Sequence, residues 1–207
     1  MSAPLPVVLV RHGRTGWNAE GRIQGHSDIP LSDAGRAEVA GWRLPEAFAG
    51  FAWTASPLAR ARDTALILGA PPDALALDRR LREIHWGAWE GCTMDDLRDH
   101  LPLIRRARAE GGLDFCAPGG ETNRELQARL VSWLGDVAAR GRPTVAVAHQ
   151  GVIRALLALA TGWDMRGPPP SELQWAAAHL FHLGEGRRLA VGELNIALAA
   201  PARRAAP

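Results

Sequence analysis

The sequence predicts an α/β protein, a three-layer sandwich in which helices cover both faces of a mostly parallel central sheet. Two short and continuous apolar runs, residues 7–10 and 145–148, are typical of strands buried on both faces. Around them, short apolar runs alternate with segments of helical periodicity, which favours parallel strands. A length of 207 residues and a hydrophobic content of 47% suit one domain, and we expect residues 1–207 to form it.

The first half of the chain is predicted to alternate strands with loops and helices. After the strand at 7–10, the predicted elements are a loop (14–32), a helix (33–48), a strand (51–55), a helix (57–68) and a short strand with its exit (75–84). A polar loop as long as the first one is usually functional. Ser32 or Asp33 caps the first helix, and Ser56 with Pro57 at the first helical position opens the second.

The second half continues the alternation and closes with paired strands. The predicted elements are helices over 94–109 and 122–140, a strand at 143–148, a helix at 151–161, and strands at 177–184 and 187–194. Glycine and proline between 111 and 120 separate the two long helices. The tail 199–207, rich in Ala, Pro and Arg, is expected to be disordered.

The composition excludes several classes of function. All 24 basic residues are Arg, and the absence of Lys excludes a Schiff-base enzyme and a Walker-type phosphate loop. A net charge of +2 does not indicate a nucleic-acid surface. No apolar stretch approaches the roughly 20 residues of a membrane helix. Cys92 and Cys116 are the two cysteines, and the N-terminus lacks a signal-peptide pattern, so we expect a cytoplasmic protein.

A histidine stands at the end of each of the two apolar runs. His12 comes after the run at 7–10 within Arg11-His12-Gly13, and His149 follows the run at 145–148. In open parallel sheets, ligands bind outside the carboxyl ends of the strands, so these two side chains are expected to converge. Each of them alone would more often be a hydrogen-bonded histidine at the edge of a core.

Further motifs stand in a fixed order around the two histidines. They are Thr15 and Asn18, Gly21-Arg22-Ile23-Gln24-Gly25, Ser56-Pro57-Leu58-Ala59-Arg60-Ala61-Arg62-Asp63-Thr64-Ala65, Leu81-Arg82-Glu83, Gly87-Ala88-Trp89-Glu90-Gly91, Pro118-Gly119-Gly120-Glu121-Thr122 and Ala148-His149-Gln150-Gly151. In this order and spacing, the set resembles the histidine phosphatase superfamily, which includes the cofactor-dependent phosphoglycerate mutases and broad-specificity phosphatases. The resemblance covers about residues 6–195 and implies a phosphoglycerate mutase-like fold.

The resemblance implies five catalytic residues: Arg11, His12, Arg62, Glu83 and His149. A neutral imidazole can attack phosphorus without a metal, provided that its other ring nitrogen is held as a donor. His12 is the implied nucleophile, and phosphohistidine is the implied intermediate. Arg11 and Arg62 offer rigid donors to the phosphoryl oxygens, His149 donates to the same group, and Glu83 protonates the leaving oxygen.

Alternatives remain for two of these residues. The guanidinium of Arg62 could be a solvated helix charge, as we expect for Arg36 and Arg60. The carboxylate of Glu83 could pair with Arg80 or Arg82 on the surface. Weaker rivals to Glu83 as the acid are Asp33, Glu90 and Glu121.

Four residues are predicted to contact phosphate or substrate: Asn18, Gln24, Gly25 and Gln150. Gly25 would permit close approach of the backbone. Arg14 stands where the commonest family pattern has Glu, and it either adds positive charge at the pocket mouth or points to solvent. Trp86 and Trp89 flank Glu83 and are candidates for the pocket wall. The segment 93–116, a candidate lid, is expected to select the substrate.

These features together predict a phosphomonoester hydrolase that acts on small phosphorylated metabolites through a phosphohistidine. No cofactor and no metal are expected, the partner is a small-molecule phosphate ester, and we expect neither nucleic acid nor membrane. The oligomeric state, monomer or homodimer, is left open. An α-ribazole phosphatase of cobalamin assembly is the specific alternative. A phosphoglycerate mutase is disfavoured because the segment between Glu83 and His149 is short, and intact His12 and Glu83 argue against a non-catalytic binder of phosphorylated ligands.

Overall fold

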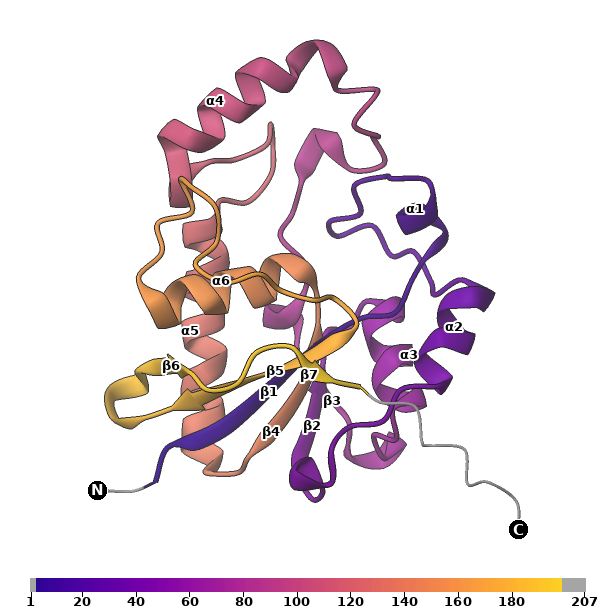
Figure 1. Cartoon of the computed structure of the whole chain (residues 1–207), viewed down its shortest axis with the longest axis vertical. Coiled ribbons are helices and arrows are strands. Elements are labelled where there is room, and N and C mark those ends of the chain that lie inside the picture. The colour runs from indigo at the N-terminus through magenta and orange to yellow at the C-terminus, as the bar shows by residue number, and fades with distance from the viewer. Residues whose placement is uncertain (1–2, 199–207) are drawn as a thin grey trace.

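The framework of the computed structural model, which describes residues 3–198, is a central sheet with helices on both faces (Figure 1). Its strands are β1 (Leu5–Arg11), β2 (Ala52–Ala55), β3 (Ala76–Leu77), β4 (Thr144–Ala148), β5 (Ala177–Leu183), β6 (Leu189–Val191) and β7 (Ile196–Ala197). The order across the sheet is β3, β2, β4, β1, β5 and β6, and β7 pairs with β5. The first four strands are parallel, whereas β5 is antiparallel to its neighbours, so the predicted fold class is confirmed.

The helices are α1 (Gly16–Ala19), α2 (Asp33–Ala40), α3 (Ala59–Ile67), α4 (Leu101–Gly111), α5 (Asn123–Arg140) and α6 (Gln150–Thr161). Helices α5 and α6 cover one face of the sheet, and α2 and α3 cover the other. Short 3-10 turns are η1 (Glu46–Phe48), η2 (Pro72–Ala74), η3 (Arg79–Leu81), η4 (Gly87–Trp89), η5 (Arg98–His100), η6 (Gly112–Asp114) and η7 (Glu185–Arg187). Side chains alternate along β1, so Val7 and Leu9 pack with α5 and α6, whereas Val8 and Val10 pack with α2 and α3.

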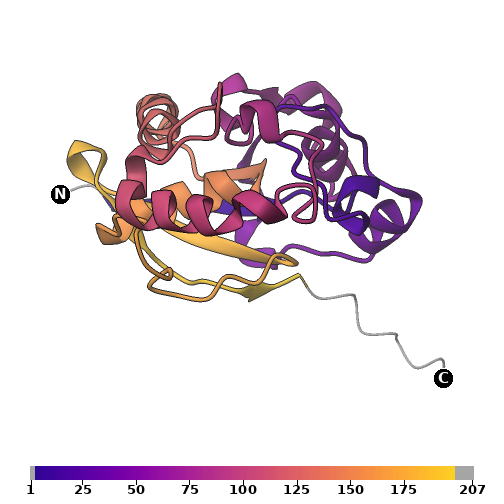
Figure 2. The same cartoon turned by 90° about the horizontal axis from the view of Figure 1, so that it is seen from above.

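Helix α4 lies apart from these two layers, beyond the carboxyl ends of the parallel strands. Figure 1 shows it at the top of the molecule, and Figure 2, viewed from above, shows it running across that end. None of its residues is buried. This position makes α4 a cover for the edge of the sheet where ligands of parallel sheets bind.

Two predicted helices have different boundaries in the structure. The helix predicted over 33–48 ends at Ala40, because Gly41 is its C-cap and the chain then turns. The helix predicted from Pro57 begins at Ala59. The hydroxyl of Ser56 accepts a hydrogen bond from the backbone N–H of Leu58 at 3.3 Å, so Ser56 stabilises the turn before the helix instead of capping it.

The segment after residue 93 also differs from its prediction. The helix predicted over 94–109 is a turn closed by Thr93 and Asp96, then η5, and then α4 from Leu101. Pro102 in the first turn explains this start, because proline suits a position whose N–H has no helical partner. The helix predicted over 122–140 is α5, closed by a capping box of Thr122 and Glu125.

Three remaining features lie outside the sheet: possible membrane-spanning helices, the cysteines and the C-terminal tail. No helix among residues 3–198 is long and apolar enough to cross a membrane. Both cysteines are free thiols. The tail predicted to be disordered, residues 199–207, lies outside the described residues.

Candidate active site

Two adjacent parallel strands, β1 and β4, bring His12 and His149 together. Arg11 at the end of β1 pairs with Ala148 at the end of β4, and the backbone N–H of His12 donates to the carbonyl of Ala148 at 3.0 Å. The centroids of the two imidazole rings are 5.1 Å apart. The convergence that the sequence predicts is therefore present in the structure.

The ring of His12 has the hydrogen bonding that a nucleophile needs. Its Nδ1 lies 2.7 Å from the carbonyl oxygen of Gly13, which can only accept, so Nδ1 carries the proton and Nε2 keeps its lone pair. Burial, followed by the charges of Arg11 and Arg60, holds the pKa of His12 well below its usual range. His12 is therefore neutral near physiological pH. Gly13 fits tightly here, since a Cβ would lie 2.3 Å from Cγ2 of Val39.

A cavity of about 610 Å³ opens beside His12, between the strand ends and α4. It is lined by His12 and Arg11, by residues of the loop at 18–25, by Arg60, Glu83, Trp86 and Trp89, by Leu101, Ile104, Arg105 and Arg108 of α4, and by Gln150 and Arg154 of α6. Trp86 and Trp89 stack with ring centroids 6.2 Å apart, so they form part of the wall as predicted. The segment 93–116 supplies the outer wall.

The arginine that α3 presents to the cavity is Arg60, and the assignment of Arg62 is wrong. Arg60 is fully buried, and its guanidinium donates to the carbonyls of Gly25 at 2.8 Å and Ser27 at 2.7 Å. The side chain of Arg62 is 44% exposed and pairs with Asp63 at 2.8 Å, away from the cavity. Arg62 therefore matches its alternative, a solvated helix charge.

Helical geometry explains why Arg60 and not Arg62 faces the cavity, and it would have indicated this from the sequence. Residues 60, 61, 64 and 65 form the buried face of α3, whereas residue 62 lies on the opposite face. The hydroxyl of Thr64 donates to the carbonyl of Arg60 and accepts the N–H of Gly13 at 3.0 Å. The motif thus fixes α3 against the end of β1, with Arg60 turned inward.

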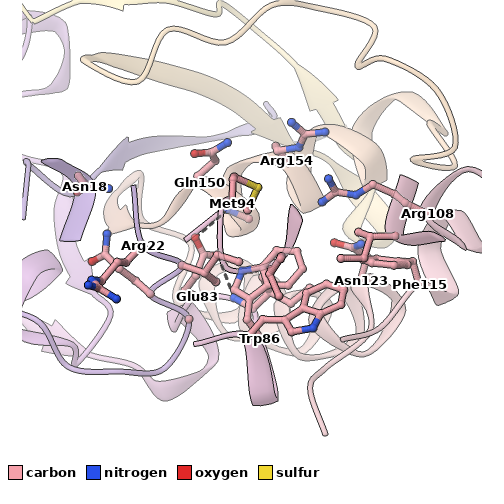
Figure 3. A pocket seen from close by; sticks show the side chains of 18 of the residues that line it. Asn18, Arg22, Glu83, Trp86, Met94, Arg108, Phe115, Asn123, Gln150 and Arg154 are labelled. Atoms are coloured by element: carbon pink, nitrogen blue, oxygen red, sulfur yellow. Dashed lines mark hydrogen bonds between the residues drawn. The ribbon is translucent and has the colours of Figure 1, made fainter. Parts of the chain in front are cut away.

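Glu83 lies on the cavity wall, in the loop after η3, and its carboxylate is enclosed by backbone groups. One oxygen accepts from the N–H of Ile84 at 2.9 Å and the other from the N–H of Gly151 at 3.1 Å. Burial raises the pKa of Glu83, although these hydrogen bonds and the nearby arginines oppose the rise. Figure 3 shows Glu83 in the middle of the lining residues.

The carboxylates that rival Glu83 have other partners or positions. Arg80 pairs with Asp78 and Asp136, so it does not hold Glu83 at the surface. Glu121 pairs with Arg129 at 2.7 Å. Glu90 accepts from the backbone of residues 26, 27 and 86, and Asp33 is exposed in the first turn of α2. Within residues 3–198, Glu83 is the one acidic side chain on the cavity wall.

Several buried nitrogen atoms beside His12 have no partner among the described residues. They are Nε of Arg11, Nε of Arg60 and both ring nitrogens of His149. Burial, followed by Arg60 and His12, holds the pKa of His149 well below its usual range. Arg11 lies over the ring of Trp175 at 5.7 Å. An anion with several oxygens, such as a phosphoryl group, would satisfy donors arranged in this way.

The residues that are predicted to contact phosphate or substrate all line the cavity. They are Asn18, Gln24, Gly25 and Gln150. The side-chain oxygen of Asn18 accepts from the backbone and hydroxyl of Thr15, which leaves its amide N–H groups as donors. Gly25 has a φ of +54°, and a Cβ there would lie 2.0 Å from Oε1 of Glu90, so a larger residue does not fit.

The position of Arg14 distinguishes between its two interpretations. Arg14 is exposed and does not line the cavity, which agrees with the interpretation that it points to solvent. Among residues 3–198, no group of three or more His, Cys, Asp or Glu side chains could hold a metal ion. The sequence interpretation missed three more arginines of the cavity, Arg105 and Arg108 on α4 and Arg154 on α6, because nothing local in the sequence shows that α4 lies over the sheet edge and faces α6 across the cavity.

Comparison with known proteins identifies the family to which a chain with this fold and site belongs. The sequence profile of the histidine phosphatase superfamily (branch 1) matches residues 7–195, so the chain belongs to that superfamily. The predicted resemblance is confirmed.

Relatives within the superfamily include phosphatases and proteins named as mutases. The chain is 37% identical over 172 residues to a glucosyl-3-phosphoglycerate phosphatase of Mycolicibacterium vanbaalenii, covering 75% of this chain and 74% of that protein. It is 38% identical over 157 residues to phosphoglycerate mutase-like protein 4 of Arabidopsis thaliana, covering 72% and 68%.

Solved structures agree with this placement. A mycobacterial glucosyl-3-phosphoglycerate phosphatase solved with VO3 superimposes with a TM-score of 0.75 at 29% identity, covering 93% of this chain and all of that chain. An α-ribazole phosphatase from Shigella flexneri reaches the same TM-score at 21% identity, which shows a shared fold and no more.

Proposed function

We propose that this protein is a phosphomonoester hydrolase that works through a phosphohistidine on His12. The observation that carries this proposal is the hydrogen bond from Nδ1 of His12 to the carbonyl of Gly13. It fixes the tautomer that leaves Nε2 with a lone pair, beside Arg11, Arg60 and Glu83 on one cavity wall. The relatives named as phosphatases support the same reaction class.

In the first step, the lone pair on Nε2 of His12 forms a bond to phosphorus. The bond between phosphorus and the leaving oxygen breaks, and its electron pair stays on that oxygen. Glu83, whose pKa is raised by burial, gives its proton to the same oxygen, and the alcohol departs. Arg11, Arg60 and His149 donate to the phosphoryl oxygens, where the charge of a loose transition state is spread.

In the second step, water replaces the histidine on phosphorus. The carboxylate of Glu83 takes a proton from the attacking water, the P–N bond breaks, and its electron pair returns to Nε2 of His12. Inorganic phosphate then leaves. We propose that no metal takes part, because buried arginines supply the charge that a cation provides in other phosphoryl-transfer enzymes.

The test is to trap the intermediate. After a rapid quench with labelled p-nitrophenyl phosphate, the protein should carry phosphate that is labile in acid and stable in base, and peptide mapping should place it on His12. The His12→Ala variant should trap none, whereas the control His100→Ala, which removes an exposed histidine on η5, should trap as much as the wild type. Label on any other side chain would refute His12 as the nucleophile.

A second measurement addresses the metal. Turnover should be unchanged after dialysis against a chelator. Loss of activity that added magnesium or zinc restores would contradict metal independence while leaving the nucleophile to be judged by the trapping experiment.

A further inference from the structure

The cavity wall is strongly basic beyond the phosphoryl site. Its charged residues are six arginines (Arg11, Arg22, Arg60, Arg105, Arg108 and Arg154) and Glu83. Arg11 and Arg60 lie next to His12, and Arg22 pairs with Glu20 at 2.6 Å. The proposed reaction needs positive charge at the phosphoryl group, and Arg11 and Arg60 supply it. Arg108 on α4 and Arg154 on α6 have no part in that step. These two arginines therefore need a separate explanation.

Aromatic rings hold the guanidinium groups of Arg108 and Arg154. Arg108 lies 5.5 Å from the ring centroid of Phe115 and 5.9 Å from that of Trp86, and Arg154 lies 5.2 Å from that of Trp163. Burial lowers the pKa of each, and the charge of Arg108 adds to the lowering for Arg154. Neither side chain has a hydrogen bond or ion pair with any residue in the range 3–198. Contact with aromatic rings uses none of the N–H groups, which leaves them as donors for another partner.

This lack of a partner is not due to a lack of acids nearby. Glu110 on the same helix pairs with Arg106 at 2.7 Å, and Asp114 in η6 pairs with Arg124 at 2.6 Å. The charges of these two neighbouring guanidinium groups repel each other, and the arrangement becomes favourable when an anion lies between their donors.

The two arginines form the border of a second cavity. Arg108, Asn123 and Arg154 line the large cavity and also a smaller one of about 220 Å³, whose other walls include Arg166 and Pro168. Figure 3 shows Arg108 and Arg154 on one side of the large cavity with Asn123 near them, whereas Asn18 and Arg22 lie on the opposite side and Glu83 lies between. A molecule with its phosphoryl group at His12 can therefore extend toward this border.

We propose that Arg108 and Arg154, with Asn123, form an anion-binding subsite for a second acidic group of the substrate, a carboxylate or a phosphate. This inference rests on the proposed function, because it assumes that the first acidic group is the phosphoryl group that His12 attacks. The preferred substrate class is thus a phosphomonoester whose alcohol portion carries an acidic group. Guanidinium forks bind both carboxylates and phosphates in bidentate fashion, so the two sources share one recognition chemistry.

The test uses matched substrates that differ only at the far end. Linear alkyl phosphates of increasing length are prepared with a terminal carboxylate, a terminal phosphate or a terminal hydroxyl, and kcat/KM is measured for each. At the length that spans the two sites, the acidic compounds should exceed the hydroxyl compound by about 10- to 100-fold, the range expected of hydrogen bonds between charged groups. The better of the two acids identifies the source.

Variants then locate the effect. Arg108→Gln and Arg154→Gln should each lower the ratio of acidic to hydroxyl substrate by about tenfold, and the ratio cancels any general loss of activity. Arg106→Gln is the matched control, because Arg106 is an exposed residue of the same helix that does not line the cavity. An equal loss in Arg106→Gln, or a ratio near one at every length in the wild type, would overturn the subsite.

A binding experiment keeps this inference separate from the proposed function. Phosphonates replace the phosphate esters, because their P–C bond cannot be hydrolysed by this mechanism, and Kd is measured by calorimetry. A carboxylate or phosphate preference that Arg108→Gln abolishes supports the subsite even if no ester is turned over. Turnover of hydroxyl esters without any such preference would refute the subsite while leaving the hydrolase proposal intact.

Discussion

The floor of the cavity, formed by His12, Arg60 and Glu83, and its outer wall, formed by residues 93–116, hold their side chains in different ways. On the floor, the ring of His12 donates a hydrogen bond to one carbonyl, and the guanidinium of Arg60 donates to two carbonyls. The carboxylate of Glu83 accepts hydrogen bonds from two backbone N–H groups. On the outer wall, α4 has no buried residue, and the guanidinium of Arg108 lies near two aromatic rings without a hydrogen bond or ion pair to any of the described residues.

This difference separates the positioning of the reacting groups from the choice of substrate. Backbone groups of residues 13, 25, 27, 84 and 151 fix the groups that we propose act on phosphorus, so their geometry depends on the framework around the sheet edge. The wall depends on one exposed helix, where most substitutions have small effects on stability. A change of substrate by mutation of α4 is therefore compatible with an unchanged floor.

The largest effect is expected from removal of the proposed nucleophile. His12→Ala should lower kcat by about 10⁴-fold or more, because loss of a covalent nucleophile removes the reaction path itself. Steady-state kinetics with p-nitrophenyl phosphate measure it, and His100→Ala should match the wild type. A mild loss in His12→Ala would show that the floor does not supply the covalent step.

The next effect depends on the leaving group. Glu83→Gln should slow hydrolysis of alkyl phosphates by about 10² to 10⁴-fold, whereas aryl phosphates with acidic phenols should lose far less. Because burial raises the pKa of Glu83, its acid form persists to higher pH than that of an ordinary glutamate. In the wild type, kcat/KM for alkyl phosphates should fall as the pH rises through this raised pKa, and the variant should lack that limb. Equal losses on both substrate types would exclude Glu83 as the acid.

A smaller effect distinguishes the two arginines of α3. Arg60→Gln should lower kcat/KM by about 10² to 10³-fold, the usual result of removing one donor to a developing anion. Arg62→Gln should stay within about twofold, because exposed ion pairs contribute little. Thermal unfolding checks that both variants are folded. The reverse order of losses would restore the motif-based assignment of Arg62.

A change near Glu83 that removes no functional group should have a weaker effect. In Gly151→Ala, the new Cβ would lie 2.3 Å from Oε1 of Glu83, so the carboxylate must shift. We expect a loss of about 10- to 100-fold on alkyl phosphates, in line with the cost of small displacements in active sites. Gly167→Ala is the control, since nothing lies within 4 Å of its new Cβ. If both variants keep full activity, the position of the carboxylate is less critical than the floor geometry indicates.

The smallest effect is expected on the outer face of α4. Leu103 is 67% exposed, and Leu103→Ala should change the free energy of unfolding by no more than about 0.5 kcal/mol. Leu156→Ala, which truncates a fully buried side chain of α6, should cost about 2 to 5 kcal/mol. Denaturant titration measures both. A large loss in Leu103→Ala would mean that α4 contributes more to the fold than its exposure indicates.

The sequence predicted the sheet and the convergence of the two histidines because both depend on local patterns. Continuous apolar runs define β1 and β4, and the first polar residue after each run must lie at the sheet edge. The start of α5 was also predictable, since its cap is formed by neighbouring residues, Thr122 and Glu125.

The features that the sequence did not predict depend on contacts between distant segments. Arg60 is buried because carbonyls more than thirty positions earlier accept its hydrogen bonds, and a motif alone does not show which face of a helix meets them. The environment of the Glu83 carboxylate is set by the N–H of Gly151, which is 68 positions away. The outer wall was missed for the same reason, because α4 has no buried stripe to reveal where it docks.

The contact between the rings of His12 and His149 has a consequence for proton balance. In the proposed cycle, a phosphoryl group on His12 brings close to two negative charges next to a neutral ring that also faces Arg11, Arg60 and Arg129. The added charge favours the imidazolium form of His149 and the acid form of Glu83, so the site takes up protons from solution as the anion arrives. The heat of vanadate binding should therefore vary with the ionisation enthalpy of the buffer, and the slope gives the number of protons absorbed.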